Sequence, residues 1–144
     1  MAAFLNKLGL IKWFSGVLAE SVGGLGVSGT AAGVILVLAY MYAHYMFAST
    51  TAHITAMFGA FFAAAVSLNA PAMPTALMMA AASNIMMTLT HYATGTSPVI
   101  FGSGYTTMGE WWKAGFIMSV VNFLIFFRYR QHLVESSGVL VREK

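Results

Sequence analysis

The chain has 144 residues, of which 59% are hydrophobic and 8% are charged, with a formal net charge of +3 and a mean hydropathy of +0.78. This balance excludes a soluble globular domain and indicates an integral membrane protein. The few basic residues form no patch of the kind that binds nucleic acid, and a sequence without cysteine has neither disulfides nor thiolate metal sites.

Charged residues occur only near the two ends of the chain. None falls within residues 21–109, so this segment suits lipid or a buried core. Residues 3–20 combine apolar side chains with three charged ones, a pattern typical of a helix that lies at the membrane surface. Four glycines between residues 23 and 29 then predict a turn.

Two apolar runs follow, at residues 31–48 and 54–68, and Ser49-Thr50-Thr51 separates them. The first is close to the shortest length that crosses a hydrocarbon core of about 30 Å, whereas the second is short for a crossing. Together the two runs predict a re-entrant helical hairpin with a polar tip.

A second interruption lies at residues 90–98, after a Met- and Ala-rich helix predicted for residues 75–89. Gly95 and Pro98 disfavour a continuous helix, and Ser97, which precedes the proline, is expected to leave the helical region. Backbone freed inside a membrane must be paired by protein or must line a wet cavity. A broken helix at this depth therefore indicates a binding site.

The last membrane segment is predicted at residues 114–127, after Glu110-Trp-Trp-Lys113, a sequence typical of the headgroup level. These elements predict an all-α membrane protein. Its parts are an interfacial helix, a re-entrant helical hairpin, a mid-membrane broken helix and a terminal transmembrane helix. Only four carboxylates occur, all in the peripheral parts of the sequence, and no nucleophile and base are paired, so we expect no enzymatic activity.

Two stretches resemble a known family: Leu89-Thr-His-Tyr-Ala-Thr-Gly-Thr-Ser-Pro-Val-Ile-Phe-Gly-Ser-Gly-Tyr105, and Glu110-Trp-Trp-Lys-Ala-Gly115. They are similar to the C-terminal signature of the divalent anion:sodium symporters, above all the bacterial citrate/dicarboxylate exchangers and the plastid oxoglutarate/malate translocators. The resemblance covers only the C-terminal part of such a transporter. It implies a multi-pass protein of the bacterial inner membrane that transports citrate, succinate, malate, tartrate or 2-oxoglutarate by antiport or symport.

Transporters of this family contain two inverted repeats, and the carboxylate binds between two hairpin tips and two broken helices. The resemblance assigns substrate binding to the tip and the break, at Ser49, Thr50, Thr51, Thr94, Gly95 and Thr96. Helix ends present unpaired amides with a partial positive charge, which suits a carboxylate. In the alternative interpretation these hydroxyls only bond back to their own helices.

Thr50 stands where the symporters have asparagine. Asparagine offers a carbonyl and an amide, whereas threonine offers one hydroxyl. The difference argues against sodium coupling and favours exchange of one dicarboxylate for another. The candidate cation site implied by the resemblance consists of Ala48, Thr50 and Ala93, and no other cofactor is expected.

Histidines are the only residues of the uncharged segment that titrate near neutral pH. His53 follows the tip and His91 precedes the break, so both are candidates for charge compensation; the alternative is a neutral imidazole bonded to a backbone carbonyl. No pair of histidines, His44 included, has the spacing of a zinc site, and we predict no metal site of that kind.

Residues 128–144 form a polar tail where relatives end in an apolar helix. A reading frame shifted by one base from Arg130 can encode Gly-Ser-Ile-Trp-Trp-Lys, a family-like ending, so we interpret the tail as a frameshift product. Residues 1–127 are then the C-terminal portion of a transport domain. We expect this fragment to be inactive unless it joins the missing N-terminal half or a second copy. The alternative is a small, non-transporting membrane protein that oligomerises through Gly-rich helix faces.

Overall fold

The computed structural model describes residues 9–137, and within this range it contains helices, turns and no strand. The elements in chain order are α2 (Leu10–Gly23), α3 (Gly29–Tyr42), η1 (Ala43–Met46), α4 (Thr50–Ser67), α5 (Ala72–Ile85), η2 (Met86–Thr88), α6 (Ser97–Gly102) and α7 (Met108–Ser137). The all-α membrane prediction is confirmed. Residues 3–8 of the predicted surface helix and residues 138–144 of the predicted tail lie outside the described range.

Three described segments are long and apolar enough to cross a membrane: Gly29–Met46, Thr50–Ser67 and Met108–Tyr129. The second arm of the hairpin is thus 18 residues long rather than the 15 expected. It is longer because the helix begins at Thr50 and includes the last two residues of the tip.

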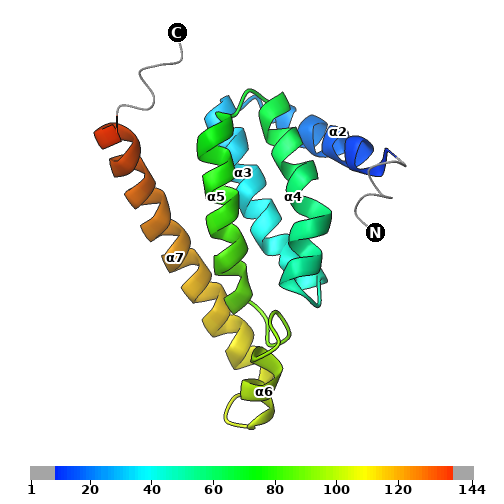
Figure 1. The fold of residues 1–144 in the computed structure, drawn as a ribbon, viewed down its shortest axis with the longest axis vertical. Coiled ribbons are helices and arrows are strands. Elements are labelled where there is room, and N and C mark those ends of the chain that lie inside the picture. Colours follow the sequence, from blue (N-terminus) through cyan, green and yellow to red (C-terminus); the bar gives the residue numbers. More distant parts are fainter. Residues whose placement is uncertain (1–8, 138–144) are drawn as a thin grey trace.

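Helices α3, α4 and α5 lie side by side, with alternating chain direction, and α7 runs along the outer side of α5 (Figure 1). Helix α2 crosses near the end of the bundle opposite the tip. Phe14 of α2 packs edge-on against Phe61 of α4, with ring centroids 6.0 Å apart. Trp13 on α2 is 66% exposed. A short helix that crosses the bundle and exposes an indole fits the predicted surface helix.

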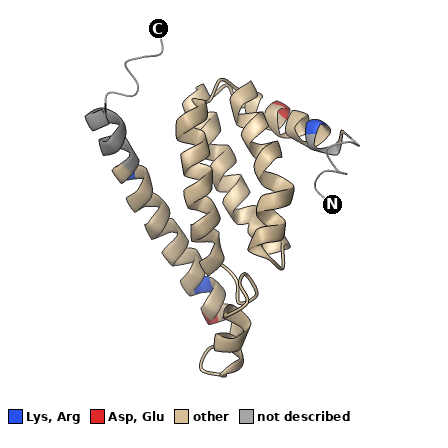
Figure 2. Cartoon of the chain, viewed as in Figure 1, with Lys and Arg blue, Asp and Glu red and all other residues tan. Residues whose placement is uncertain are grey.

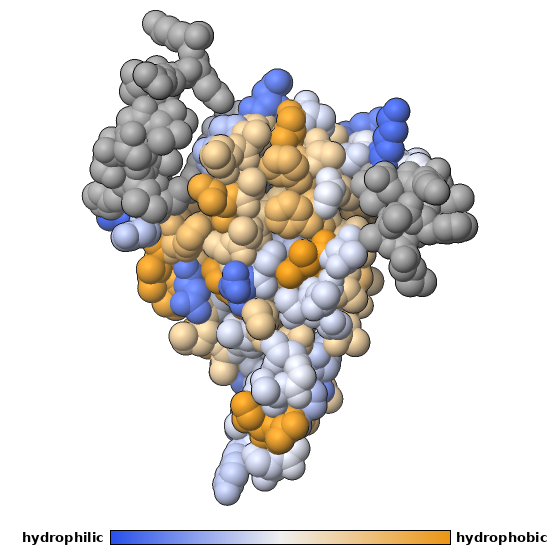
Figure 3. Space-filling model, in the orientation of Figure 1, coloured by the Kyte–Doolittle hydropathy of each residue, from blue (hydrophilic) through white to orange (hydrophobic). Residues whose placement is uncertain are grey.

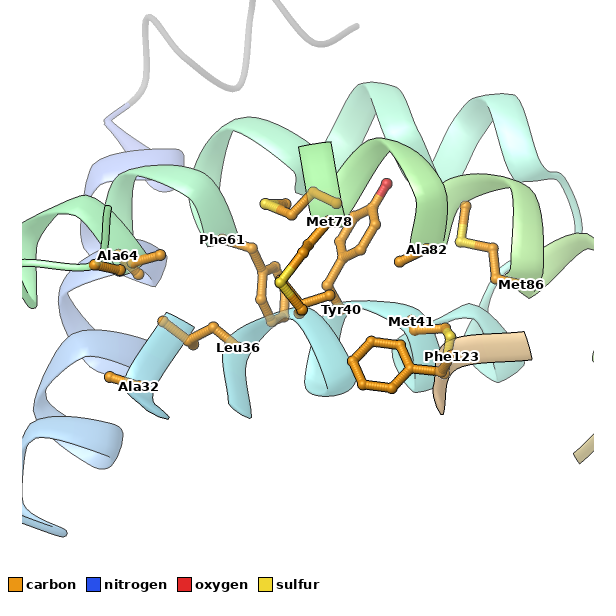
Figure 4. Packing of buried hydrophobic residues seen from close by; sticks show 14 of the residues in the cluster. Ala32, Leu36, Tyr40, Met41, Phe61, Ala64, Met78, Ala82, Met86 and Phe123 are labelled. Carbon is orange, nitrogen blue, oxygen red and sulfur yellow. The ribbon is translucent and has the colours of Figure 1, made fainter. Parts of the chain in front are cut away.

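Alanine and methionine dominate the contact between α3, α4 and α5 (Figure 4). Its buried members include Leu36, Tyr40, Met41, Phe61, Ala64, Met78, Met79 and Ala82. Small side chains let membrane helices approach closely. At Gly29 a Cβ atom would overlap the Asn69 carbonyl group, and at Gly33 it would lie 3.0 Å from Ala70 Cβ. The Gly29–Gly33 face is therefore occupied by a contact within the chain.

Side-chain caps begin several of the helices. Ser49 caps α4 by accepting from Ala52 N at 3.5 Å. At α7 the Thr107 N–H donates to Glu110 Oε2 at 2.8 Å, while the Glu110 N–H donates to Thr107 Oγ1 at 3.3 Å, which is a capping box. This cap starts α7 before the predicted residue 114. The sequence has no glycine or proline from 116 to 137, and the helix runs past the predicted end at 127.

The predicted break is confirmed. Helix α5 ends at Ile85, the short η2 follows, and turns occupy the chain until Ser97 begins α6. Ser97 does not leave the helical region as expected, because Pro98 stands in the first turn of α6, where a missing N–H costs no hydrogen bond.

Charge and hydropathy divide the described part of the molecule. Lys, Arg, Asp and Glu occur on α2 and α7, whereas α3, α4, α5 and α6 carry none (Figure 2). The face shown in Figure 3 is largely apolar over the bundle, whereas towards the end that bears α6 paler residues surround one apolar group. The segments that form the tip and the break thus contain no formally charged residue.

Candidate functional site

The tip of the hairpin contacts the break. The Thr50 N–H donates to the Ala93 carbonyl at 3.2 Å, and Thr50 Oγ1 donates to the same oxygen at 2.8 Å. These residues are 43 positions apart in the sequence. The structure therefore brings together the two interruptions that the sequence singled out.

A cavity of about 510 Å³ lies at this contact. Among the described residues its lining comes from the tip, the preceding Ala48 and the break: Ala48, Ser49, Thr50, Thr51, Tyr92, Ala93, Thr94, Gly95 and Pro98. The volume falls within the range of about 300 to 1,000 Å³ that is usual for small-molecule sites. No formally charged side chain lines this cavity, so any anion held here would be held by dipoles and hydroxyls.

The first turn of α4 provides the donors on the tip side. Its Thr51 N–H and Thr51 hydroxyl make no hydrogen bond to the described part of the chain, and the side chain is exposed. Ser49 accepts from Ala52 N only at 3.5 Å, so its hydroxyl proton is available to another acceptor. The N-terminus of an 18-residue helix also carries a partial positive charge.

Hydroxyls on the break side bond mainly to one another. Thr94 Oγ1 lies 2.7 Å from Ser97 Oγ and accepts from the Ser97 N–H at 3.2 Å. Thr96 Oγ1 lies 3.2 Å from Thr94 Oγ1, and Thr96 does not line the cavity. At Gly95 a Cβ atom would meet nothing within 4 Å, so this backbone is open to a ligand.

Two lining residues, Tyr92 and Pro98, were not among the predicted site residues. Tyr92 donates its hydroxyl to the Tyr45 carbonyl at 2.8 Å, which ties the break to the end of the first hairpin arm. Pro98 was recognised only as a helix breaker. No periodicity marks either residue as part of a site, because both depend on how distant segments meet.

The two histidines expected to compensate charge do not line the cavity. His53 is fully buried beneath the tip, where Tyr40 and Phe47 of the first arm lie with ring centroids 4.7 Å from its own. His91 is half-buried, and its Nδ1 accepts from Trp112 Nε1 at 3.3 Å. Trp112 thus packs inward and does not serve only as a headgroup anchor.

In the candidate cation site, the Ala93 carbonyl oxygen already accepts two hydrogen bonds. Both Thr50 donors point at the Ala93 carbonyl, which has two lone pairs to offer. Within the described residues no group of three or more histidine and acidic side chains could hold a metal ion.

Known proteins have sequences similar to this one. The family model described as the sodium:sulfate symporter transmembrane region matches residues 1–132. The chain is 48% identical over 126 residues to the chloroplastic dicarboxylate transporter 1 of Arabidopsis thaliana, which is 88% of this chain and 23% of the relative. It is 46% identical over 126 residues to the putative malate transporter YflS of Bacillus subtilis, with 88% and 26% covered.

A further relative is the L-tartrate/succinate antiporter of Escherichia coli, 37% identical over 122 residues, with 84% of this chain and 25% of the relative covered. The chain thus spans about a quarter of the length of the curated relatives it matches. Since the family model matches nearly all of the chain, the resemblance is confirmed: this integral membrane chain belongs to the divalent anion:sodium symporter family, a family of membrane transporters.

Proposed function

We propose that this chain supplies one wall of the substrate site in a secondary transporter of di- and tricarboxylates in the bacterial inner membrane. The observation that carries the proposal is the contact between Thr50 and Ala93, which joins the tip to the break beside one uncharged cavity. The names of the relatives above, which include malate, succinate and tartrate, favour dicarboxylates over the tricarboxylate citrate. The chain performs no catalytic step in this proposal.

One carboxylate of the substrate would lie at the first turn of α4. The Thr51 N–H and hydroxyl and the Ser49 hydroxyl are its donors, since none of them is committed to a strong hydrogen bond. The second carboxylate would lie at the break, near the open backbone of Gly95 and the hydroxyl of Thr94. Thr96, which lies behind Thr94, would support that hydroxyl and make no contact with the substrate.

We also propose that the chain works by exchange without sodium. In this structure Thr50 itself bridges the tip and the break, because both of its donors occupy the Ala93 carbonyl. A cation at Ala48, Thr50 and Ala93 would have to displace these two hydrogen bonds. Replacing sodium with choline is therefore expected to leave substrate binding unchanged, and a strong requirement for sodium would contradict exchange.

A wall formed by one tip and one break leaves the far side of a substrate without partners. We propose that the opposite wall comes from an N-terminal half or from a second copy, and that residues 1–127 form the transport-domain portion. The 144-residue chain alone in vesicles is then expected to show no dicarboxylate exchange. Exchange by this polypeptide as a monomer would contradict this part of the proposal.

The packing of Gly29 and Gly33 favours the transporter over an oligomerising packing module. Gly29 faces Asn69, and Gly33 faces Ala70 and Thr75 of the same chain. The face with the glycine spacing that would mediate oligomerisation is therefore already covered. Oligomerisation through helix faces also does not require two polar interruptions to meet beside a cavity.

The test is ligand binding by the chain in lipid nanodiscs. L-Tartrate and succinate are expected to raise the thermal unfolding midpoint, whereas acetate, with one carboxylate, is not. Thr51→Val removes one hydroxyl donor and should weaken tartrate binding by about tenfold, or about 1.4 kcal/mol. Thr30→Val is the matched control, because Thr30 is exposed at the far end of α3. The proposal would be contradicted if acetate raised the unfolding midpoint as much as tartrate does, or if no dicarboxylate raised it.

A further inference from the structure

Two imidazoles lie together beneath the tip, one from each arm of the hairpin. His44 belongs to η1 and His53 to the second turn of α4, and both side chains are 0% exposed. Their ring centroids are 5.4 Å apart at an interplanar angle of 43°. The proposed function gives His44 no role, although it is as deeply buried as His53.

None of the four ring nitrogens of His44 and His53 has a hydrogen-bond partner. The backbone of Tyr40 lies close to the His53 ring without completing a well-aligned bond, and the Tyr40 hydroxyl is taken by Ser83 at 2.8 Å. Phe47 offers only its ring. Buried polar groups are almost always paired, so four unpaired nitrogens side by side require an explanation.

No fixed charge faces this pair from the described elements packed against α4. Helices α3 and α5 contain no acidic or basic residue, and the charged residues of α2, Lys12 and Glu20, are exposed. Among the described residues, Tyr40 is the one other titratable side chain in ring contact with the pair. A proton on the pair would thus have no resident counterion, and a dicarboxylate in the cavity would have no resident cation.

The pair is connected to the cavity through the backbone of α4. The His53 N–H donates to the Ser49 carbonyl at 3.0 Å, so the His53 backbone lies about one helical turn, or about 5 Å, along the axis of α4 from a lining residue. Because both imidazoles are fully buried, an anion and a cation at about such a separation attract more strongly than they would in water. Each would compensate the charge of the other.

Resting on the proposed dicarboxylate site, we propose that the His44–His53 pair takes up one proton when a dicarboxylate enters the cavity, so that the anion and the proton bind together. The proton comes from the buffered solution, where the buffer's conjugate base remains, and it adds to a bare ring nitrogen to form an N–H bond on one imidazole. That N–H donates to the bare nitrogen of the other ring. A centroid separation of 5.4 Å lets a ring rotation bring two nitrogens to a hydrogen-bonding distance of about 3 Å.

The experiment measures L-tartrate binding to the 144-residue chain in nanodiscs between about pH 6 and 8, where both tartrate carboxyl groups stay ionised. Uptake of one proton per anion makes the affinity rise about tenfold for each unit of pH decrease. Calorimetry in two buffers of different ionisation enthalpy should give one proton taken up per tartrate. Binding with no pH dependence and no proton uptake would overturn the inference and leave the proposed function standing.

Variants identify the group that takes up the proton. His44→Gln and His53→Gln are each expected to abolish proton uptake, and His91→Gln, outside the pair, to retain it. Because a buried variant can misfold, the unaltered chain with ¹⁵N-labelled histidine provides a second measurement. Tartrate should shift the ring nitrogens of two histidines towards imidazolium values and leave the others in place. Unshifted rings despite binding would refute the inference, and no tartrate binding at any pH would remove the proposed function with it.

Discussion

The two ends of the α3–α4 hairpin are held by contacts of different kinds. At the end opposite the tip, the backbone at Gly29 lies against the Asn69 carbonyl group with no room for another atom. At the tip, the hairpin is joined to the break by the hydrogen bonds from Thr50 to Ala93 and from Tyr92 to Tyr45. Close packing resists any change of shape, whereas a few hydrogen bonds beside a cavity can be exchanged for bonds to water or to a ligand. The tip is therefore the end suited to opening.

Gly29→Ala tests the closely packed end and should have the largest effect. Its new Cβ would meet three backbone atoms of Leu68 and Asn69, none of which can rotate away. We expect a loss of about 2 to 3 kcal/mol in the free energy of unfolding, measured by denaturation in mixed micelles. Gly59→Ala is the matched control, because a Cβ there meets nothing within 4 Å, and it should be neutral or slightly stabilising. Similar losses for both variants would refute the contrast in packing.

Gly115→Ala tests whether close packing of α7 against η2 stabilises the break. A Cβ at this position would lie 2.5 Å from the Thr88 carbonyl oxygen and 3.0 Å from that of Leu89. Because α7 packs on one side only, it can move away from η2, and the cost should be smaller, about 1 to 2 kcal/mol. Gly109→Ala, with open space around its Cβ, is the control. An unchanged unfolding midpoint for Gly115→Ala would show that α7 does not hold the break.

The sequence predicts features of the local backbone better than it predicts contacts between distant segments. The positions of both interruptions were predicted, because glycine, proline and hydroxyl residues act on their own local backbone. Ser97 was placed wrongly, since the first helical turn tolerates the proline that follows it. The start of α7 was missed although Thr107-x-x-Glu110 is a readable capping signature.

Contacts between distant segments could not be predicted from residue patterns. The Thr50–Ala93 contact joins residues 43 apart, and in the sequence only the family resemblance suggested that tip and break face one another. The inward packing of Trp112 on His91 likewise depends on where α7 docks. The assignment of Ser49, Thr51 and Thr94 to substrate binding stays a prediction.

Thr50→Val breaks the tip contact with little change in side-chain volume. It removes the hydroxyl that donates to Ala93 at 2.8 Å and keeps the N–H, so we expect a loss of about 1 kcal/mol in unfolding free energy. Thr50→Ser restores the donor and should recover most of this loss. The sequence contains no cysteine, so single cysteines introduced at positions 51 and 95 can report the opening through their rate of alkylation. Valine should accelerate alkylation at both positions, and an unchanged rate would mean that Thr50 does not hold the tip closed.

Tyr92→Phe makes the smallest and most selective change at the tip. It deletes the hydroxyl that donates to the Tyr45 carbonyl and keeps the ring, with an expected cost of about 0.6 kcal/mol. Tyr105→Phe, on a side chain that is 91% exposed, controls for the loss of a phenol. Because Tyr45 ends the first arm and Tyr92 begins the break, the loss should add to that of Thr50→Val if the two bonds act independently. A combined loss smaller than the sum would mean that breaking one bond already disrupts the other, so that the tip opens in one step.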